Sequence, residues 1–308
     1  MSAKWVTVMG SFVADLAFRT EKLPAWGETF MGSSFQLGPG GKGSNQAVAA
    51  ARAGGRVSFI SKLGHDPFGD LARATYAAEG IDTRHLLSTS TPTGAAAIII
   101  DAHSGENAII VVPGACFELT PHELDGMTAL IAASAIFVTQ LELALPTVKR
   151  GLELAHSLKV PTILNPAPAR NLPASIFPCC DFITPNETEA EILTGIRVTT
   201  RAGAERAADA LLALGVRNVI VTLGSEGVLV KNSTIVAHIP AFDAGPVVET
   251  TGAGDAFTGG LAVALAEGKD VLQAARFGCA VAGLSVTRPG TAPYMPTRPE
   301  VDALLNQP

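Results

Sequence analysis

The turn Gly252-Ala253-Gly254, followed by Asp255, is the stretch of this sequence best suited to chemistry. Glycine allows a tight turn that leaves backbone N–H groups uncovered, and the apolar residues beyond it predict a helix that starts here. The free N–H groups and the dipole of a helix start attract an anion. Asp255 can cap this helix, as aspartate often does, or act as a general base beside the anion. From this stretch alone, both interpretations stay open.

A second glycine-rich stretch, at residues 38–45, leads into an alanine-rich segment that we expect to be a helix. It resembles a phosphate-binding loop but lacks the Gly-Lys-Ser/Thr ending of the Walker A motif. Lys42 and Asn45 can donate hydrogen bonds to hydroxyl groups. We expect this helix start to hold a neutral polyol and residues 252–255 to hold an anionic group. The alternative interpretation of residues 38–45 is a glycine-rich turn without a ligand, which leads into a tightly packed helix.

Polar residues follow several predicted strands at the point where each strand ends. In an open parallel sheet, ligands gather at the carboxyl ends of the strands. One shared crevice therefore explains these positions better than a series of independent caps. The residues are Asp15, Asn45, Glu142, Asn165, Asn186, Glu187, Thr222 and Asp255.

The elements that must position these residues alternate between strand and helix. This alternation predicts a three-layer α/β/α fold with a mainly parallel sheet and right-handed crossovers. Two β-like regions, at about 12–38 and 94–112, do not fit it and predict a small β-sheet lid. We expect a single domain over residues 1–308 with this lid inserted. The main elements are predicted as strands at 5–9, 57–61, 135–139, 162–164, 182–184 and 218–222 and helices at 46–53, 68–79, 146–158, 202–214, 257–267 and 271–285.

Composition argues against several classes of protein. With 47% hydrophobic and 16% charged residues, the chain is globular and not disordered. Its net charge of −6 argues against an extended nucleic-acid-binding surface. No stretch has the pattern of a membrane span or a signal peptide. The four cysteines lack metal-ligand spacing, and free thiols in a reducing compartment explain them most simply. We therefore expect a cytosolic protein with no membrane partner.

Five stretches, in order along nearly the whole chain, resemble signatures of the ribokinase-like (phosphofructokinase-B type) carbohydrate kinases. Residues 40–50 resemble the first family signature and residues 251–257 the second. Residues 165–170 and 184–191 resemble the ribokinase branch, and residues 286–290 also fit. The resemblance implies an ATP-dependent carbohydrate kinase. It would phosphorylate the 5-hydroxymethyl group of a pentose, D-ribose or 2-deoxy-D-ribose.

The resemblance also implies a role for each residue of the site. Asp255 would accept the hydroxyl proton, and the N–H groups of Gly252, Ala253 and Gly254 would stabilise charge on the transferred phosphoryl group. Mg²⁺ would accompany ATP near Asn186 and, indirectly, Glu187. Sugar contacts are implied for Asp15, Gly41, Lys42, Asn45, Glu142 and Asp255. Nucleotide contacts are implied for Asn186, Thr222, Gly224, Ser225, Gly227, Gly254 and Cys279.

A monovalent cation, usually K⁺, is a further expectation from the resemblance. Two of the matching positions depart from the family pattern, since Glu249 replaces the usual Asp and Tyr294 replaces a frequent Ser. The expected cation positions are Glu249, Thr251, Ser285, Arg288, Gly290 and Tyr294. The resemblance, together with the exposed strand edges of the lid, also implies a homodimer formed through the β lid.

Val13 stands where ribokinases carry an asparagine that contacts a ribose hydroxyl. Valine cannot form hydrogen bonds, and leaving a buried hydroxyl unpaired costs about 1–3 kcal/mol. We therefore predict a relaxed or altered sugar preference at this substrate-binding position, with 2-deoxyribose as a candidate. The alternatives are a kinase of the same family that acts on a nucleoside or hexose, and a non-catalytic sugar-binding regulator. A dinucleotide-dependent oxidoreductase is disfavoured, because Gly10 starts no Gly-x-Gly-x-x-Gly motif.

Overall fold

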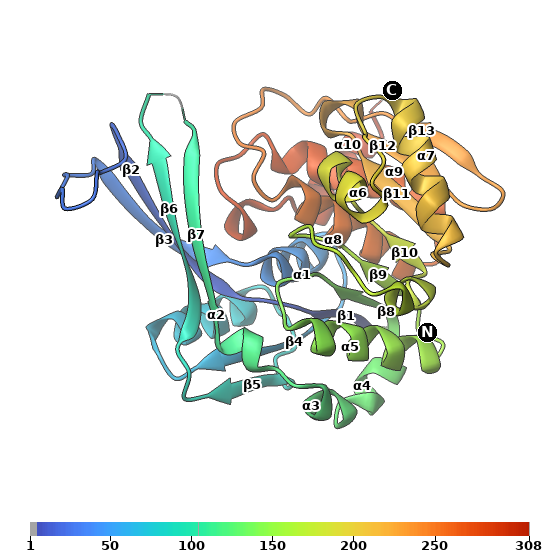
Figure 1. Cartoon of the computed structure of the whole chain (residues 1–308), viewed down its shortest axis with the longest axis horizontal. Coiled ribbons are helices and arrows are strands. Elements are labelled where there is room, and N and C mark those ends of the chain that lie inside the picture. Colours follow the sequence, from blue (N-terminus) through green and yellow to red (C-terminus); the bar gives the residue numbers. More distant parts are fainter. Residues whose placement is uncertain (1–4, 104, 308) are drawn as a thin grey trace.

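The computed structural model describes residues 5–103 and 105–307. They form a nine-stranded sheet covered by helices on both faces and a four-stranded sheet that projects from one side (Figure 1). The large sheet has the order β13-β12-β11-β10-β9-β8-β1-β4-β5. Its strands from β11 to β5 run parallel, and β12 and β13 at the other edge are antiparallel. The predicted three-layer fold with a mainly parallel sheet is confirmed.

The strands of the large sheet are short, and most coincide with the predicted ones. The edge strand β5 was not expected, because four residues without a clear alternation give little signal in a sequence. The strands are β1 (Trp5–Met9), β4 (Val57–Gly64), β5 (Leu86–Thr89), β8 (Ser134–Thr139), β9 (Thr162–Leu164), β10 (Phe182–Ile183), β11 (Asn218–Thr222), β12 (Val228–Lys231) and β13 (Val236–Ile239). The helices are α1 (Lys42–Arg52), α2 (Pro67–Ala78), α3 (Pro121–Asp125), α4 (Thr128–Ala132), α5 (Leu145–Ser157), α6 (Glu187–Thr194), α7 (Arg201–Ala213), α8 (Ala253–Ala266), α9 (Val271–Ser285) and α10 (Arg298–Leu305).

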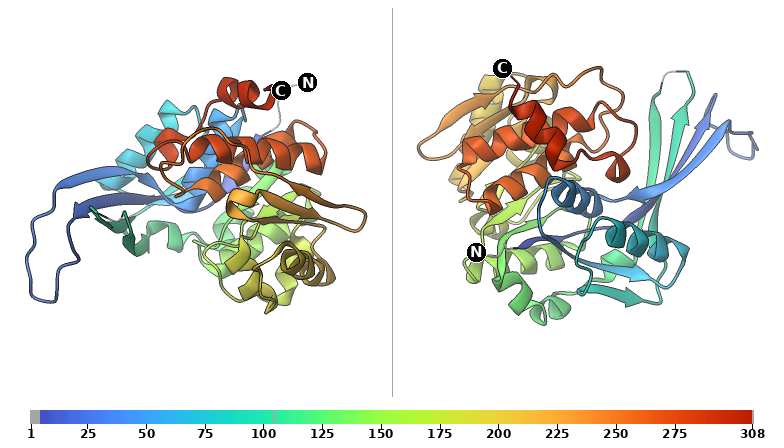
Figure 2. Two further views of the ribbon diagram at one scale, coloured as in Figure 1. Left: turned by 90° about the horizontal axis from the view of Figure 1, so that it is seen from above. Right: turned by 180° about the vertical axis from the view of Figure 1, so that it is seen from behind.

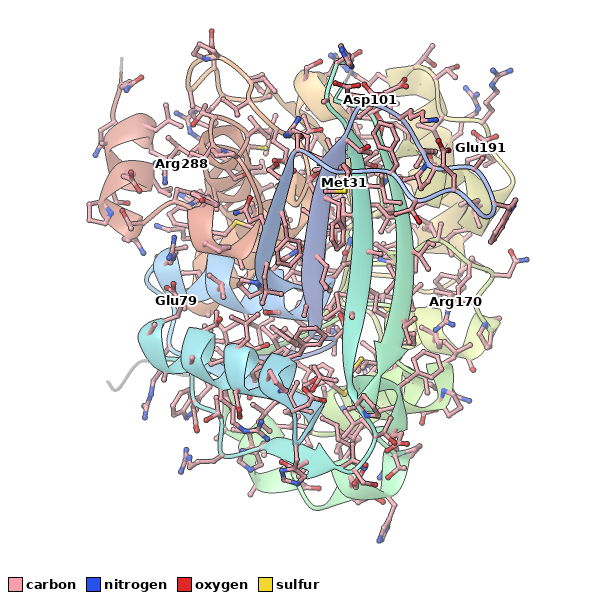
Figure 3. All side chains as sticks on the ribbon, turned by 90° about the vertical axis from the view of Figure 1, so that its left-hand side faces the viewer. Met31, Glu79, Asp101, Arg170, Glu191 and Arg288 are labelled. Atoms are coloured by element: carbon pink, nitrogen blue, oxygen red, sulfur yellow. The ribbon has the colours of Figure 1, made fainter. Side chains whose placement is uncertain are left out.

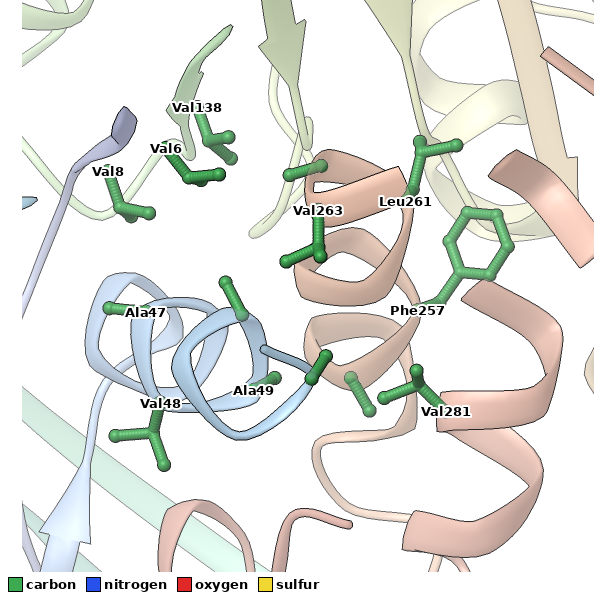
Figure 4. Packing of buried hydrophobic residues seen from close by; sticks show 14 of the residues in the cluster. Val6, Val8, Ala47, Val48, Ala49, Val138, Phe257, Leu261, Val263 and Val281 are labelled. Atoms are coloured by element: carbon green, nitrogen blue, oxygen red, sulfur yellow. The ribbon is translucent and has the colours of Figure 1, made fainter. Parts of the chain in front are cut away.

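Alternate residues of the central strands enter two cores, one on each face of the large sheet. In β1, Val6 and Val8 belong to one core and Met9 to the other. The first core lies against α1, α2, α8, α9 and α10, and the second against α3 to α7. Figure 4 shows part of the first core, where β1 and β8 meet α1, α8 and α9.

Helices α1 and α8 pack closely, because small residues line their contact. A Cβ atom added to Gly259 would lie 2.7 Å from the Cβ of Ala49 and 2.8 Å from the carbonyl oxygen of Gln46. Such distances are shorter than van der Waals contact, so only glycine fits at position 259 without displacing α1. The two helices therefore start side by side at the same end of the molecule.

The starts of α1 and α8 differ from those of several other helices. Their N-caps are Gly41 and Gly252, whose φ angles of 88° and 81° suit glycine, and neither start has a side-chain cap. The N-cap residue of each of these two helices therefore offers no side-chain acceptor to the first N–H groups; at the start of α1, the carboxylate of Glu142 from another part of the chain accepts the N–H of Lys42. At the starts of five other helices, the N-cap side chain accepts a hydrogen bond from a backbone N–H group of the first turn. These acceptors are Asp66 for α2, Thr120 for α3, Asn186 for α6, Thr200 for α7 and Asp270 for α9.

The four-stranded sheet projects from the body beside α1 and α2 (Figure 2), and Figure 3 shows it face on. It consists of β2 (Val13–Thr20), β3 (Ser34–Gly40), β6 (Thr93–Asp101) and β7 (Asn107–Gly114), in the order β3-β2-β6-β7. Val13 and Asp15 lie in β2, within the region 12–38 that predicted the lid. The expectation that Asp15 follows the end of a strand is wrong, because Asp15 is the third residue of β2. Across residues 5–103 and 105–307, no helix combines the length and apolarity needed to cross a membrane.

Candidate active site

One pocket lies where the starts of α1 and α8 meet the carboxyl ends of β9, β10 and β11. This is the arrangement that the polar residues after the predicted strands suggested. The pocket is lined by Lys42, Asn165, Ala167, Thr184, Asn186, Glu189, Thr222, Gly252, Gly254 and Asp255. Both predicted glycine-rich helix starts therefore contribute to one pocket.

Asp255 is buried in the first turn of α8 and directs its carboxylate at α1. Its Oδ2 accepts a hydrogen bond from Nδ2 of Asn45 at 3.0 Å. Its Oδ1 accepts one from Nε2 of Gln46 at 2.9 Å. Gly252 occupies the N-cap position, so the interpretation of Asp255 as the cap of this helix is wrong. The carboxylate is held by side chains of another helix and lines the pocket.

The turn before Asp255 offers backbone N–H groups to the same pocket. Gly252 and Gly254 line it, and a Cβ atom added to Gly254 would meet no atom within 4 Å. The N–H group of Ala253 donates to the carbonyl oxygen of Thr250 at 3.2 Å. The open glycine turn and the positive end of the α8 dipole make this part of the pocket suitable for an anion.

Glu142 ties the start of α1 to the ends of β1 and β8. Its carboxylate accepts hydrogen bonds from the Ser11 hydroxyl and, at 2.9 Å, from the backbone N–H of Lys42. Gly41 packs against the backbone of residues 11–13. Of the predicted sugar-contacting residues, Gly41, Lys42, Asn45 and Glu142 are thereby brought to one place, joined to Asp255 through Asn45.

Asp15 on β2 approaches the same group of residues. A Cβ atom added to Gly40 would lie 2.2 Å from the Asp15 carboxyl group, so glycine there makes room for the carboxylate. Burial raises the pKa of Asp15 to about 7, with further contributions from Glu142, Asp255 and Glu249. Val13 starts the same strand and is buried.

Lys42 provides the positive charge of this cluster. Its pKa is raised chiefly by the negative charge of Asp255, against the opposing effect of burial, and further by Glu142 and Glu189. Lys42 also lines the pocket. The pocket thus contains the positive charge of Lys42 together with the carboxylates of Asp255 and Glu189.

Asn186 and Glu189 form the opposite wall of the pocket. Asn186 caps α6, and the two residues make a capping box in which each side chain accepts the other residue's backbone N–H. Asn186 also bridges to Thr222, the last residue of β11. Burial raises the pKa of Glu189. Glu189 lines the pocket, whereas Glu187, the residue expected from the sequence, is half-buried and is not among the lining residues.

The remaining predicted nucleotide contacts lie beyond Thr222 and in α9. Gly224 and Ser225 form the short 3-10 helix after β11 and are exposed. Gly227 has a φ of 93°, and a Cβ atom added to it would lie 2.1 Å from the carbonyl oxygen of Ile239, so the turn requires glycine. Cys279 is buried within α9, and its burial raises the pKa of its thiol to about 12.

The loops before α8 and after α9 lie side by side. The backbone N–H of Glu249 donates to the Val286 carbonyl at 3.2 Å, and the N–H of Gly290 donates to Oε2 of Glu249 at 2.7 Å. Arg288 forms an ion pair with Glu300 at 2.6 Å. Two short neighbouring segments thus contain all the predicted cation residues, namely Glu249, Thr251, Ser285, Arg288, Gly290 and Tyr294.

Sequence reasoning missed Gln46, Gln140 and Glu189. Gln46 and Gln140 are buried side chains that form hydrogen bonds behind Asp255. A glutamine among alanines and valines on a predicted core helix was the available signal for Gln46, because a polar group buried there needs partners. The spacing Asn186-x-x-Glu189 was the corresponding signal for a capping box.

Comparisons with known proteins agree with this geometry. A family model described as pfkB family carbohydrate kinase matches residues 3–298. The chain is 41% identical over 297 residues to a ribokinase of Haemophilus influenzae, covering 96% of this chain and 97% of that protein. It is 37% identical over 303 residues to a deoxyribokinase of Salmonella typhimurium, covering 98% of each. The structure of Arabidopsis thaliana ribokinase complexed with ribose and ATP superposes with a TM-score of 0.94, at 32% identity and 100% coverage of both chains.

Proposed function

The chain belongs to the pfkB family of carbohydrate kinases. We propose that it phosphorylates a pentose on the 5-hydroxyl group, with the residue roles given below. The protein is an ATP-dependent sugar kinase, and its relatives over nearly the whole chain include ribokinases and deoxyribokinases. The observation that carries the mechanism is the position of Asp255. Its buried carboxylate lies between amide donors of α1 and the open glycine turn, within one pocket.

In this mechanism, the 5-hydroxyl oxygen attacks the γ-phosphorus of ATP while Asp255 accepts the hydroxyl proton. The bond between the γ-phosphorus and the oxygen bridging to the β-phosphate breaks, and ADP leaves with the electron pair. The N–H groups of Gly252 and Gly254 stabilise the charge of the transferred group, joined by that of Ala253 once it leaves the carbonyl oxygen of Thr250. Positioning and electrostatic stabilisation of this kind dominate phosphoryl transfer. A general base contributes about 10²–10⁴ in rate.

Asp15, Gly41, Lys42, Asn45 and Glu142 are proposed to bind the sugar. They converge on Asp255 from α1, β2 and the loop after β8, and their carboxylates and amides suit sugar hydroxyls. The nucleotide is proposed to extend over the opposite wall, along Asn186, Thr222, Gly224, Ser225 and Gly227 toward Cys279. Val13, buried at the start of β2, offers the sugar no hydrogen bond, which favours a sugar that lacks one hydroxyl.

The residues present fit the two expected cations. Glu189 and Asn186 line the pocket beside the glycine turn, and a buried carboxylate there suits Mg²⁺ that arrives with ATP, partly through water. Glu189 is a better candidate than Glu187 for this role. Mg²⁺ would neutralise charge on the phosphates. For K⁺, the adjoining loops 249–251 and 285–294 offer backbone carbonyls and the Glu249 carboxylate.

A homodimer is proposed through the four-stranded sheet. Its edge strand β7 is apolar and exposed at Ile109, Ile110, Val111 and Val112, and Phe18 and Phe35 are exposed on β2 and β3. Exposed apolar strands at a sheet edge favour pairing with another chain. The cytosolic location predicted from the cysteines stays a prediction.

The test is an ATP-consumption screen over pentoses, deoxypentoses, hexoses and nucleosides, with and without K⁺, on the wild type and on Asp255→Asn. We expect turnover with ribose or 2-deoxyribose and a loss of at least about 10²-fold in Asp255→Asn. Full turnover by Asp255→Asn would refute the base role. Preference for a hexose or a nucleoside would refute the proposed substrate, and the absence of turnover with every sugar would favour the non-catalytic alternative.

A further inference from the structure

A chain of buried side-chain amides leads from the end of β8 to the carboxylate of Asp255. Nε2 of Gln140 donates to Oε1 of Gln46 at 2.6 Å. Nε2 of Gln46 donates to Oδ1 of Asp255 at 2.9 Å and to Oδ1 of Asn165 at 3.1 Å. Gln46 and Gln140 are 0% and 1% exposed. Water therefore cannot replace these hydrogen bonds without opening the core.

Gln140 and Asp255 together set the direction of each hydrogen bond in this series of amides, since the carboxylate of Asp255 can only accept. Because Gln140 donates to the oxygen of Gln46, the NH₂ group of Gln46 must point at Asp255 and Asn165. Both hydrogens of that NH₂ group are then used. Asn165 is itself held, since its Nδ2 donates to the carbonyl oxygen of Thr184 at 3.0 Å. Gln46 consequently has one orientation in which all of its polar atoms are satisfied.

Gln140 keeps its own orientation at a cost. Its Oε1 is buried and has no hydrogen-bond partner in the part of the chain that the structure describes. A Cβ atom added to Gly10 would lie 2.2 Å from this oxygen, so glycine at position 10 leaves room for the side chain. A buried unsatisfied oxygen destabilises a fold, and its presence beside a reacting group indicates that the opposite end of the amide serves a purpose.

We propose that Gln46 and Gln140 are positioning residues that hold Asp255 by Oδ1 and leave Oδ2 as the oxygen that accepts the substrate proton. The inference rests on the proposed base role of Asp255. Asn45, the donor to Oδ2, belongs to the proposed sugar site, so the sugar hydroxyl reaches Asp255 on that side. The charged groups that act on Asp255 from neighbouring elements are Lys42 on α1, Asp15 on β2 and Glu189 on α6.

Two substitutions of Gln140 separate polarity from packing. In Gln140→Met, the apolar side chain fills a similar volume but no longer fixes the Gln46 amide. In Gln140→Glu, an ionised carboxylate faces Oε1 of Gln46 and favours a turned amide, which presents oxygen to Asp255. A protonated carboxyl group can instead donate to Oε1 and restore the original direction. Burial stabilises this neutral form, and its fraction increases as the pH falls.

The measurement is kcat and KM for sugar and ATP between pH 5.5 and 8.5, each expressed relative to the wild type at the same pH. For both variants we expect kcat to fall about ten- to a hundredfold at pH 8 with little change in either KM, because the base is misplaced and binding is intact. The relative kcat of Gln140→Glu should rise as the pH falls, and that of Gln140→Met should not change with pH. Gln46→Met should lower kcat at least as much as Gln140→Met.

Asn218→Leu is the matched control. It removes a partly buried amide pair, Asn218 with Asn232 at 2.9 Å, at the end of β11 away from the pocket. We expect it to lower the thermal unfolding temperature without lowering kcat of the folded enzyme. If both Gln140 variants keep the wild-type kcat at every pH while Asp255→Asn is inactive, the base role stands and the positioning role is wrong. Equal, pH-independent losses in the two Gln140 variants would also overturn it.

Discussion

Protonation of Asp15 should control sugar binding near neutral pH. The residue is half-buried. The burial of its carboxyl group, and then the negative charges of Glu142, Asp255 and Glu249, raise its pKa to about 7. Ionised Asp15 accepts hydrogen bonds from sugar hydroxyls through both oxygens, and protonation removes part of this capacity. We therefore expect KM for the sugar to rise by up to about tenfold for each pH unit below 7, with KM for ATP nearly constant.

The same group should affect stability with a defined sign. Its pKa is about 7 in the folded protein against 3.8 for a free side chain, so the folded state binds a proton that the unfolded state has lost. Its contribution is most favourable below pH 4 and is lost as the pH rises to 7. The difference of about 3 between the pKa values of the folded and unfolded states corresponds to a change of at most about 4 kcal/mol in the free energy of unfolding. We expect less than half of this, because Asp15 is partly exposed to water.

Asp15→Asn provides the assay for both effects. The variant cannot titrate, so its sugar KM should be high and independent of pH, and its unfolding free energy should lack the decline between pH 4 and 7. Steady-state kinetics from pH 5.5 to 8.5 and urea unfolding without sugar measure the two quantities. A wild-type sugar KM that stays constant between pH 5.5 and 7 would refute the reasoning, because Asp15 would then be ionised throughout that range.

Three further variants test other parts of the structure. Val13→Asn should shift the ratio of kcat/KM toward ribose over 2-deoxyribose by about tenfold, the value of one hydrogen bond, and an unchanged ratio would remove Val13 from the specificity site. Gly259→Val should lower the unfolding free energy by about 1–3 kcal/mol, since its side chain would collide with Ala49 across the α1–α8 contact; calorimetry showing no change would contradict this packing. Phe18→Glu combined with Ile110→Glu should produce monomers in sedimentation at micromolar concentration, and a wild type that is already monomeric would exclude the dimer.

Much of the fold was predictable because its signals are local. Apolar strands that alternate with amphipathic helices indicated the parallel sheet, and the glycine turn before Asp255 indicated a ligand-binding helix start. Contacts between distant segments gave no such signal. The direction of the Asp255 carboxylate depends on Asn45 and Gln46, about 210 residues away in the chain. Only the packing of α1 against α8 brings them within hydrogen-bond distance.

Asp15 was expected after a strand end, although it also lies in the region 12–38 that predicted the lid. Residues 10–12 after β1 resembled the start of a loop at a strand end, whereas the next residue, Val13, already begins β2. Strand β2 pairs with β3 and β6, and this pairing could not be identified from one sequence. The lid region and its candidate residues were therefore recognised from the sequence, but the pairing of the lid strands was not.

The close contact of α1 with α8 at Gly259 has an evolutionary consequence. The two helices hold the proposed base and phosphoryl-binding turn in a fixed relation, whereas Val13 and Asp15 lie on a strand of the other sheet. With the sugar site as proposed, substitutions on that strand would alter the preferred sugar while the phosphate chemistry is inherited intact. Such a division allows new substrates to be acquired by few mutations, and it accords with comparable identities of 41% and 37% to enzymes named for ribose and for deoxyribose.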